Sequence, residues 1–179
     1  MKIFITDLAA YNNMELIGKW VELGIDEDEL SQTIKEILEW GEKVCKDGSI
    51  HEEYFISDVD ADGDEPFTVE EYSNVYALNK EVARFNELDD DSAKKCVSFL
   101  MATAIVSSLD EALNKYEEVC FYEDMSFSDL AYSIVEEQYN LDDLPDFVGN
   151  YFDYDAFGRD LELEGFYTKW NGDIFYYPY

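Results

Sequence analysis

One short stretch of the sequence has the residue types and spacing of a cation-binding loop. The segment Asp58–Asp64 reads DVDADGD, so carboxylates occupy positions 1, 3 and 5 and glycine occupies position 6, as in the calcium loop of an EF-hand. That loop also needs a bidentate glutamate at position 12, where this chain has Val69, with the acid Glu70 one residue late. Two interpretations remain, a calcium-binding loop and a solvated acidic turn, and the strand-like segment before the loop favours the turn.

Residues suited to catalysis are scarce. The single histidine, His51, stands between Ile50 and Glu52, without a neighbouring serine or cysteine motif that would form a nucleophile–base pair. We therefore expect a structural or exposed histidine and no catalytic residues. The sequence has no glycine-rich phosphate-binding motif, and its many acids can be paired in too many ways for any carboxylate pair to indicate a glycosidase.

The three cysteines do not form a recognisable metal or disulfide motif. Cys45, Cys96 and Cys120 are odd in number and widely spaced, without a CxxC pair, which argues against a zinc site and for a reducing cytosol. We expect no metal and no cofactor. The apolar run at residues 1–5 is too short for a signal peptide, and no stretch has the roughly 18 apolar residues of a membrane span. The expected protein is soluble and cytoplasmic, without a membrane partner.

The last third of the chain carries acids that have few basic neighbours. Arg159 is the only basic residue from Glu117 to Tyr167. Acids three or four positions apart on a helix lie about 5–6 Å apart at Cβ, a suitable order of spacing for imitating successive phosphates of a DNA strand. The acids expected to form this surface are Asp129, Glu136, Glu137, Asp142, Asp143, Asp146, Asp153, Asp155, Asp160 and Glu162.

The overall charge points to a basic partner. The chain has 43 acidic and 12 basic residues, a net charge of −31, yet 16% of it is aromatic, so it should fold. Duplex DNA carries about two charges per base pair, so the charge equals that of about 15 base pairs, or about 30 for a homodimer. Adaptation to high salt and cation binding also explain such a composition, but a strongly basic protein surface fits the magnitude best. Nucleic acid would be repelled.

The elements that position these acids fall into three expected units. Residues 1–66 show strands at Lys2–Asp7, Leu16–Leu23 and Glu52–Val59 and an amphipathic helix at Asp26–Glu39. These elements predict a small mixed α/β unit.

Residues 67–116 have the periodicity of helices. A capping box at residues 68–71 predicts a helix with Val75, Leu78 and Val82 on its apolar side, Asp91–Ala104 predicts a second, and a capping box at residues 108–111 opens a third. We expect a helical bundle here.

Residues 117–179 are mixed again. A strand is expected at Val119–Tyr122, helices at Ser128–Gln138, from about Pro145 and at Tyr154–Leu163, and a β-hairpin about Asn171-Gly172, between strands at Phe166–Trp170 and Asp173–Tyr177. The expected fold class is α+β, an elongated chain of three small units.

Three stretches resemble the ArdA family of antirestriction proteins. The first is Ile3–Leu8 together with Tyr11-Asn12 and Gly18–Trp20, the second is Pro66–Tyr72, and the third, the most specific, is Asn150–Leu161 (NYFDYDAFGRDL). They occur in family order and span nearly the whole chain.

The resemblance implies an elongated, three-part acidic protein that dimerises through its C-terminal part. Family members mimic bent B-form DNA and inhibit type I restriction–modification enzymes by occupying their DNA-binding groove, which protects an incoming mobile element in a bacterium. The family's antirestriction segment matches at Val135–Leu161. The chain departs from the family in the acidic insertion at Asp58–Asp64 and in a longer connection at Gly41–His51.

Overall fold

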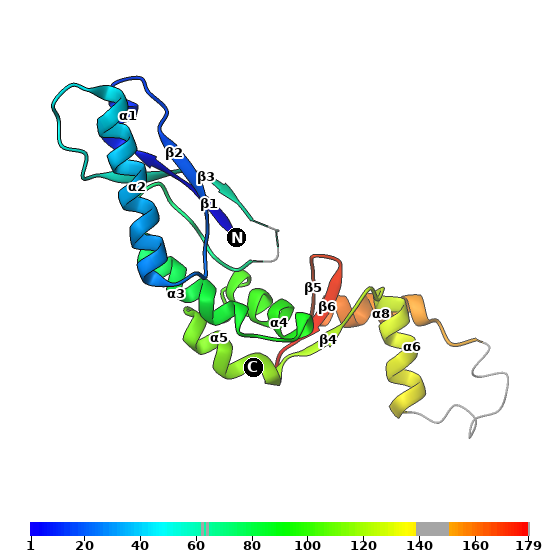
Figure 1. The fold of residues 1–179 in the computed structure, drawn as a ribbon. Helices are drawn as coiled ribbons and strands as arrows, with labels where there is room; N and C mark the ends of the chain where they lie inside the picture. Colours follow the sequence, from blue (N-terminus) through cyan, green and yellow to red (C-terminus); the bar gives the residue numbers. More distant parts are fainter. Residues whose placement is uncertain (62, 64, 139–150, 179) are drawn as a thin grey trace. The chain divides into compact units, whose positions relative to one another are not determined.

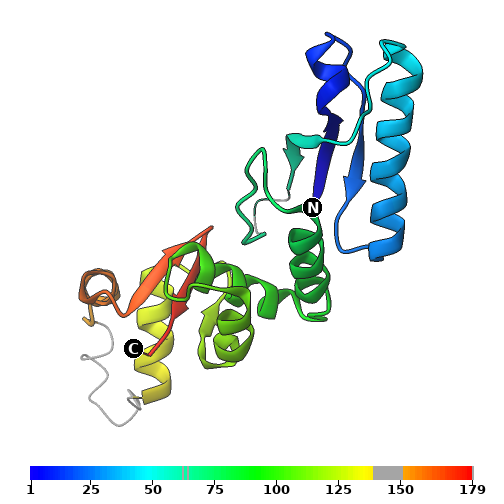
Figure 2. The same ribbon diagram turned by 90° about the vertical axis from the view of Figure 1, so that its left-hand side faces the viewer.

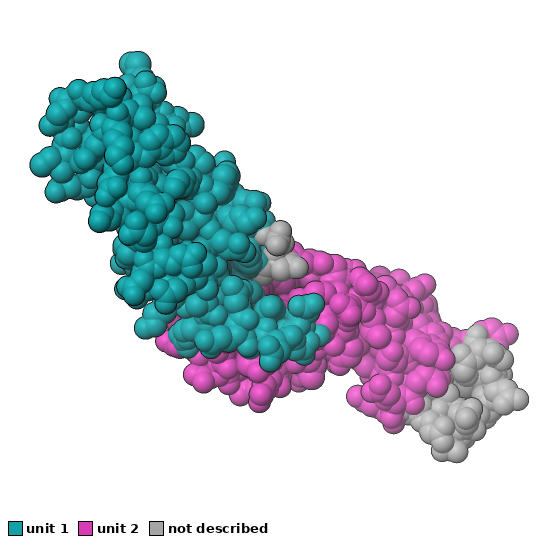
Figure 3. All heavy atoms as spheres, in the orientation of Figure 1, with its two compact units in different colours: residues 1–94 teal, residues 95–179 magenta. Residues whose placement is uncertain are grey.

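The computed structural model describes residues 1–61, 63, 65–138 and 151–178. The chain divides into two compact units, residues 1–94 and 95–179 (Figure 3). Together their described residues hold seven α-helices and two three-stranded antiparallel sheets (Figure 1), so the expected α+β class is confirmed. The division into three parts at residues 66 and 116 stays a prediction. No described helix has both the length and the apolar character needed to cross a membrane.

The first unit is built on a sheet of order β2-β1-β3. Its strands are β1 (Lys2–Asp7), β2 (Gly18–Glu22) and β3 (Tyr54–Asp60), and the long helix α2 (Glu27–Cys45) lies along the sheet (Figure 2). Alternation in β1 buries Ile3 and Ile5 completely against Leu30, Ile34 and Ile37 of α2. The core of this unit therefore lies between one face of the sheet and the apolar stripe of α2.

Two further helices complete the first unit. The short α1 (Leu8–Asn12) follows β1 directly, and Asp7 caps it by accepting a hydrogen bond of 2.9 Å from the Ala10 N–H. The helix α3 (Val75–Asn86) adds Val75, Leu78 and Val82 to the same core. In α3 the buried Asn79 accepts hydrogen bonds from two backbone N–H groups, those of Gly24 and Ile25.

The second unit joins helices to the C-terminal sheet. It contains the larger part of α4 (Asp91–Ala102), then α5 (Leu109–Lys115), the 3₁₀ turn η1 (Tyr116–Glu118) and α6 (Phe127–Gln138), followed by α8 (Tyr154–Glu164). The sheet has the order β4-β6-β5, formed by Cys120–Tyr122, Asp173–Tyr176 and Tyr167–Trp170 respectively. The chain's final described strand thus occupies the centre of this sheet.

Buried aromatic rings tie the sheet to α4. Phe99 and Phe175 are both almost completely buried and stack with ring centroids 4.4 Å apart. The hairpin turn has positive φ at Asn171 (49°) and Gly172 (97°), the conformation that a two-residue type I′ turn requires. The predicted hairpin is therefore confirmed.

Gly158 permits the close approach of α8 to the start of α6. A Cβ at this position would lie 2.7 Å from the carbonyl carbon and oxygen of Phe127, so nothing larger than hydrogen fits without a backbone shift. Around this contact Leu130, Ala131 and Leu161 form a core cluster with Ile174.

We expect Gly158→Ala to lower the free energy of unfolding of the second unit by about 1–2 kcal/mol, as overpacking of a tight contact does. Alanine in an unconstrained helix interior instead stabilises by about 0.5–1 kcal/mol relative to glycine, so the sign of the change is diagnostic. Urea denaturation of the full chain followed by circular dichroism measures it. A stabilised variant would show that α8 does not pack on α6 in this way.

The sequence-based boundaries were wrong in one instructive place. The capping box at residues 68–71 does not start a helix: α3 begins at Val75, and its cap is Asn74, whose side chain accepts from the N–H groups of Tyr76 and Ala77. The reason is tertiary, because the Glu71 carbonyl accepts a hydrogen bond of 2.8 Å from the Ile56 N–H and so holds this segment beside β3. By contrast, Ser108 does cap α5 as expected. The helix expected from about Pro145 lies outside the described residues.

Candidate acidic interface

Seven of the acids expected to form the mimic surface lie in the described part of the second unit. All seven are exposed. Three belong to α6 and four lie at or within α8, two elements that pack directly on each other. We call these seven acids the α6–α8 surface: Asp129, Glu136, Glu137, Asp153, Asp155, Asp160 and Glu162. Asp142, Asp143 and Asp146 lie outside the described residues.

Hydrogen bonds fix three of these carboxylates. Asp129 accepts from the hydroxyl (2.5 Å) and the backbone N–H (3.1 Å) of Ser126, and these two bonds, the hydroxyl first, lower the pKa of Asp129. Asp153 caps α8 through the Ala156 N–H, and Asp155 accepts from the Ser128 hydroxyl at 2.5 Å. These carboxylates have structural tasks in addition to any part in binding.

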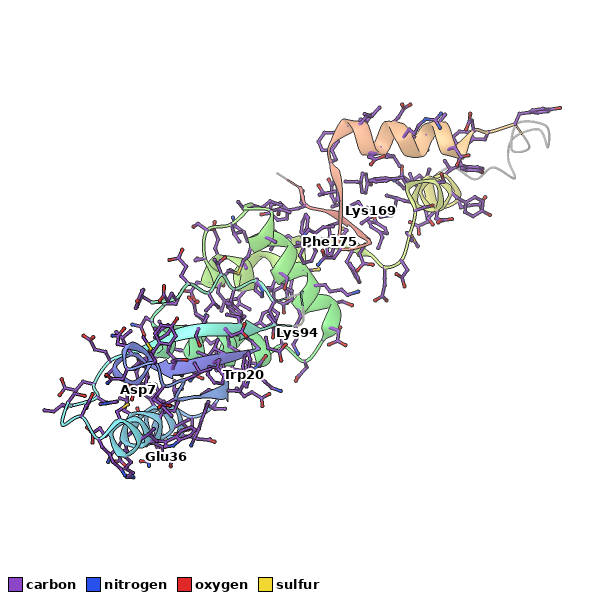
Figure 4. All side chains as sticks on the ribbon, turned by 90° about the horizontal axis from the view of Figure 1, so that it is seen from above. Asp7, Trp20, Glu36, Lys94, Lys169 and Phe175 are labelled. Carbon is purple, nitrogen blue, oxygen red and sulfur yellow. The ribbon has the colours of Figure 1, made fainter. Side chains whose placement is uncertain are left out.

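The charge of this surface is not neutralised within the described residues. None of the seven acids forms an ion pair there with a lysine or arginine. On α2 of the first unit, which carries the labelled Glu36 (Figure 4), the situation differs. Glu36 pairs with Lys19 at 3.1 Å, and Glu39 lies within 4 Å of two lysines. Hydrogen bonds from Gln32 and then Lys19 lower the pKa of Glu36. The acids of α6 and α8 therefore retain their charge for an external partner.

The first acids of the calcium-like segment belong to a strand. Asp58 and Asp60 are residues of β3, where they pair in register with Phe4 and Lys2 of β1. An EF-hand loop instead leaves a helix at its first ligand, so the strand context expected from the sequence is confirmed. Asp62 and Asp64 lie outside the described residues.

His51 is structural. Its Nδ1 lies 2.5 Å from Oδ2 of Asp7, and both side chains are completely buried. Gly41 of α2 makes this pairing possible, because a Cβ there would collide with both side chains. Asp7 thus caps α1 with one carboxylate oxygen and holds His51 with the other. No local sequence pattern predicts this role of Asp7, because its partner His51 lies 44 positions away.

The only cysteine near this pair is not activated in a way that suits a nucleophile. Burial raises the pKa of the Cys45 thiol, and the negative charges of Asp47 and Asp7 raise it further. A reactive cysteine needs the opposite shift, toward the thiolate. The described residues near His51 therefore give no support to nucleophilic catalysis.

A second pairing that the sequence did not predict lies between Lys95 of α4 and Asp173 of β6. Their Nζ and Oδ2 atoms are 2.9 Å apart, and Asp173 also accepts a bond of 2.9 Å from the Asp124 N–H. Burial raises the pKa of Asp173, but the bonds from Lys95 and Asp124 outweigh it and leave the pKa below its ordinary value. Hydrogen bonds to Asp173 and then Glu123 raise the pKa of Lys95. The pair joins α4 to the centre of the C-terminal sheet.

The Asp173–Lys95 pair gives the second unit a defined pH dependence. Because the folded-state pKa of Asp173 is depressed, its contribution is present above the unfolded pKa of about 3.9 and is lost as pH falls through the folded value. We expect Asp173→Asn to lower the free energy of unfolding of the second unit by about 2 kcal/mol at neutral pH. This loss is smaller than for a fully buried pair, because Lys95 is 27% exposed. The difference in unfolding free energy between this variant and the unmodified chain should shrink below about pH 4. Amide exchange of β5 and β6 measures it; a difference constant with pH would contradict the assignment.

Comparison with known proteins identifies the family of the chain. A comparison with curated proteins gives no match. The family model described as antirestriction protein (ArdA) matches residues 3–176, nearly the whole chain, including both units and every described acid of the α6–α8 surface. The resemblance expected from the three sequence stretches is therefore confirmed: the chain belongs to the ArdA family of antirestriction proteins.

Proposed function

We propose that this protein inhibits type I restriction–modification enzymes by mimicking B-form DNA and occupying their DNA-binding groove. The observation that carries the proposal is the α6–α8 surface, whose seven exposed acids have no basic partner among the described residues. A groove built for phosphates presents lysines and arginines, and binding there gains free energy when counterions are released. A folded chain with a charge of −31 makes the same contacts without a base sequence.

Inhibition of this kind requires no reaction, so the protein is not an enzyme and acts by occupancy alone. Its carboxylates are held on hydrogen-bonded helix ends, as at Asp129, Asp153 and Asp155. A preordered ligand loses less conformational entropy on binding than a flexible polyacid does. The expected setting is the bacterial cytoplasm, during entry of a mobile element that encodes the protein.

We also propose a homodimer formed through the second unit. Large apolar side chains are exposed on and beside α6 and α8, with Tyr132 at 52%, Leu163 at 83% and Phe166 at 57% exposure. Exposed apolar groups of this size support an interface with a second copy, which would also double the length of the acidic surface. Sedimentation equilibrium of the full chain tests the stoichiometry.

The direct test is competition with DNA. We expect the purified protein to displace a labelled duplex from a type I methyltransferase core, and its apparent affinity to fall linearly with the logarithm of salt concentration, as for phosphate contacts. Fluorescence anisotropy at several salt concentrations measures both. Inhibition of the complete enzyme without displacement of duplex would contradict DNA mimicry while leaving the antirestriction function intact.

A further inference from the structure

Two adjoining hollows lie along the outer edge of β3 in the first unit, away from the α6–α8 surface in sequence. Their volumes are about 320 Å³ and 360 Å³, and both are lined by Tyr54 and Tyr72. We call the combined feature the tyrosine pocket. The residues that matter for its chemistry are Tyr54, Tyr72, Tyr76, Glu52, Glu53 and Glu71.

Aromatic rings form the walls of the tyrosine pocket. Tyr72 is 69% exposed, whereas Tyr54 and Tyr76 are half-buried. The Tyr76 hydroxyl lies 3.2 Å from the Ser31 hydroxyl of α2, which fixes that ring. Tyr54 packs against the main core of the unit. An exposed ring beside two fixed rings offers π-faces to a flat ligand.

Carboxylates give the pocket a negative potential. A hydrogen bond to the Glu71 carboxylate, followed by the charges of Glu71 and Glu53, raises the pKa of the Tyr72 hydroxyl. Burial, and then the neighbouring Tyr76, raise the pKa of Tyr54. Among the described residues no lysine or arginine forms an ion pair with Glu52, Glu53 or Glu71. The negative charge is therefore available to a ligand.

The backbone around Tyr72 is held in place before any ligand arrives. The Ile56 N–H donates to the Glu71 carbonyl at 2.8 Å, and Ser73 closes the turn by bonding Glu70 in both directions, from its N–H to the carbonyl and from the Glu70 N–H to its hydroxyl. Asn74 then caps α3. This fixed turn explains why residues 70–73 are not helical, and it positions Glu71 and Tyr72 together at the pocket rim.

We infer that the tyrosine pocket binds the guanidinium group of an arginine side chain supplied by a partner protein. A guanidinium is planar, stacks on aromatic faces and donates two parallel hydrogen bonds to a carboxylate such as Glu71. A lysine ammonium carries the same charge, but it is not planar, so it neither stacks on a ring in this way nor donates two parallel hydrogen bonds. The inference goes beyond the proposed function, because it names a specific anchor in the first unit whichever partner provides the arginine.

The test uses the full chain and a small probe. We expect N-acetyl-arginine-N-methylamide to cause saturable amide shifts at residues 54–56 and 71–74 in an NMR titration, with a dissociation constant on the order of millimolar, as suits one side chain. The equivalent lysine probe should bind several-fold more weakly, and the neutral citrulline probe should cause no saturable shift. Tyr72→Leu removes the cation–π contact and Glu71→Gln removes the paired, charge-assisted hydrogen bonds. Each variant should bind the arginine probe about fivefold or more weakly than the unmodified chain does.

Matched variants separate the pocket from the general negative field of the chain. Glu81→Gln removes one exposed acid of α3, and Trp40→Ala removes one exposed aromatic ring of α2. Neither should change the affinity for the arginine probe. Shifts spread over many acidic regions, equal for arginine and lysine and unaffected by Tyr72→Leu and Glu71→Gln, would overturn the inference. That result would leave the proposed inhibition of restriction enzymes untouched, since the titration contains no such enzyme.

Discussion

Replacing Glu136, Glu137, Asp160 and Glu162 together by their amides is expected to weaken binding to a type I methyltransferase core by roughly 30-fold or more. Among the described residues these four exposed acids form no ion pair and no side-chain hydrogen bond, so their amides remove charge without removing a contact seen there. At about 0.5–1 kcal/mol for each exposed charge pair, four lost pairs amount to about 2–4 kcal/mol. Each tenfold loss of affinity corresponds to about 1.4 kcal/mol.

The control has the same change in charge at a different place. Glu81, Glu87, Asp89 and Glu117 are also exposed, and none of them belongs to the α6–α8 surface. Their combined amide variant should lose about threefold or less in affinity, from the reduced long-range field. Anisotropy competition measures both variants, and sedimentation checks that each keeps its assembly state. Equal losses would show that net charge, and not the α6–α8 surface, determines binding; no loss in either would contradict the mimic proposal.

Removing the Asp7 carboxylate should have the largest effect on the first unit. Asp7→Ala leaves the buried His51 ring without its partner and deprives α1 of its cap. A buried hydrogen-bonded pair broken on one side typically costs about 3–5 kcal/mol, and loss of a helix cap adds about 1 kcal/mol. We therefore expect a loss of at least 3 kcal/mol in the free energy of unfolding, roughly the lower bound of that range.

Urea denaturation followed by tryptophan fluorescence suits this measurement, because Trp20 and Trp40 both belong to the first unit. Glu15→Ala is the matched control: Glu15 is a nearby exposed acid, and its loss should change stability by less than about 0.5 kcal/mol, as at most surface positions. If Asp7→Ala behaved like Glu15→Ala, the buried pair would not stabilise this unit.

The sequence predicted those elements whose own residues determine them. The strand Lys2–Asp7 was predicted with its observed bounds because β-branched and aromatic residues, which favour an extended backbone, fill most of it. The hairpin at Asn171-Gly172 follows from local φ preferences, and α5 begins where Ser108 caps it. In each case the information lies within a few residues of the element.

Other features depend on partners that are distant in sequence. The helix α1 has five residues, too few for a periodic pattern, and depends on the Asp7 cap. Residues 68–71 had the composition of a helix start, but pairing with β3 overrode that preference. The contacts Asp7–His51 and Lys95–Asp173 join residues 44 and 78 positions apart, so no local pattern indicates them. The exposure of the described acids on α6 and α8 could be expected from the sequence, because hardly any basic residues stand near them there.

The central place of β6 in its sheet has a consequence for synthesis on the ribosome. The three strands of the first sheet all occur within residues 2–60, so that sheet can assemble while the rest of the chain is still being translated. By contrast, within the described part of the chain β4 at Cys120–Tyr122 pairs with β6 at Asp173–Tyr176 alone, so this pairing cannot form until those late residues have been synthesised. We expect nascent chains arrested before residue 173 to resist protease in the first unit and to be cut in the second. Protection of both units at that stage would contradict this order.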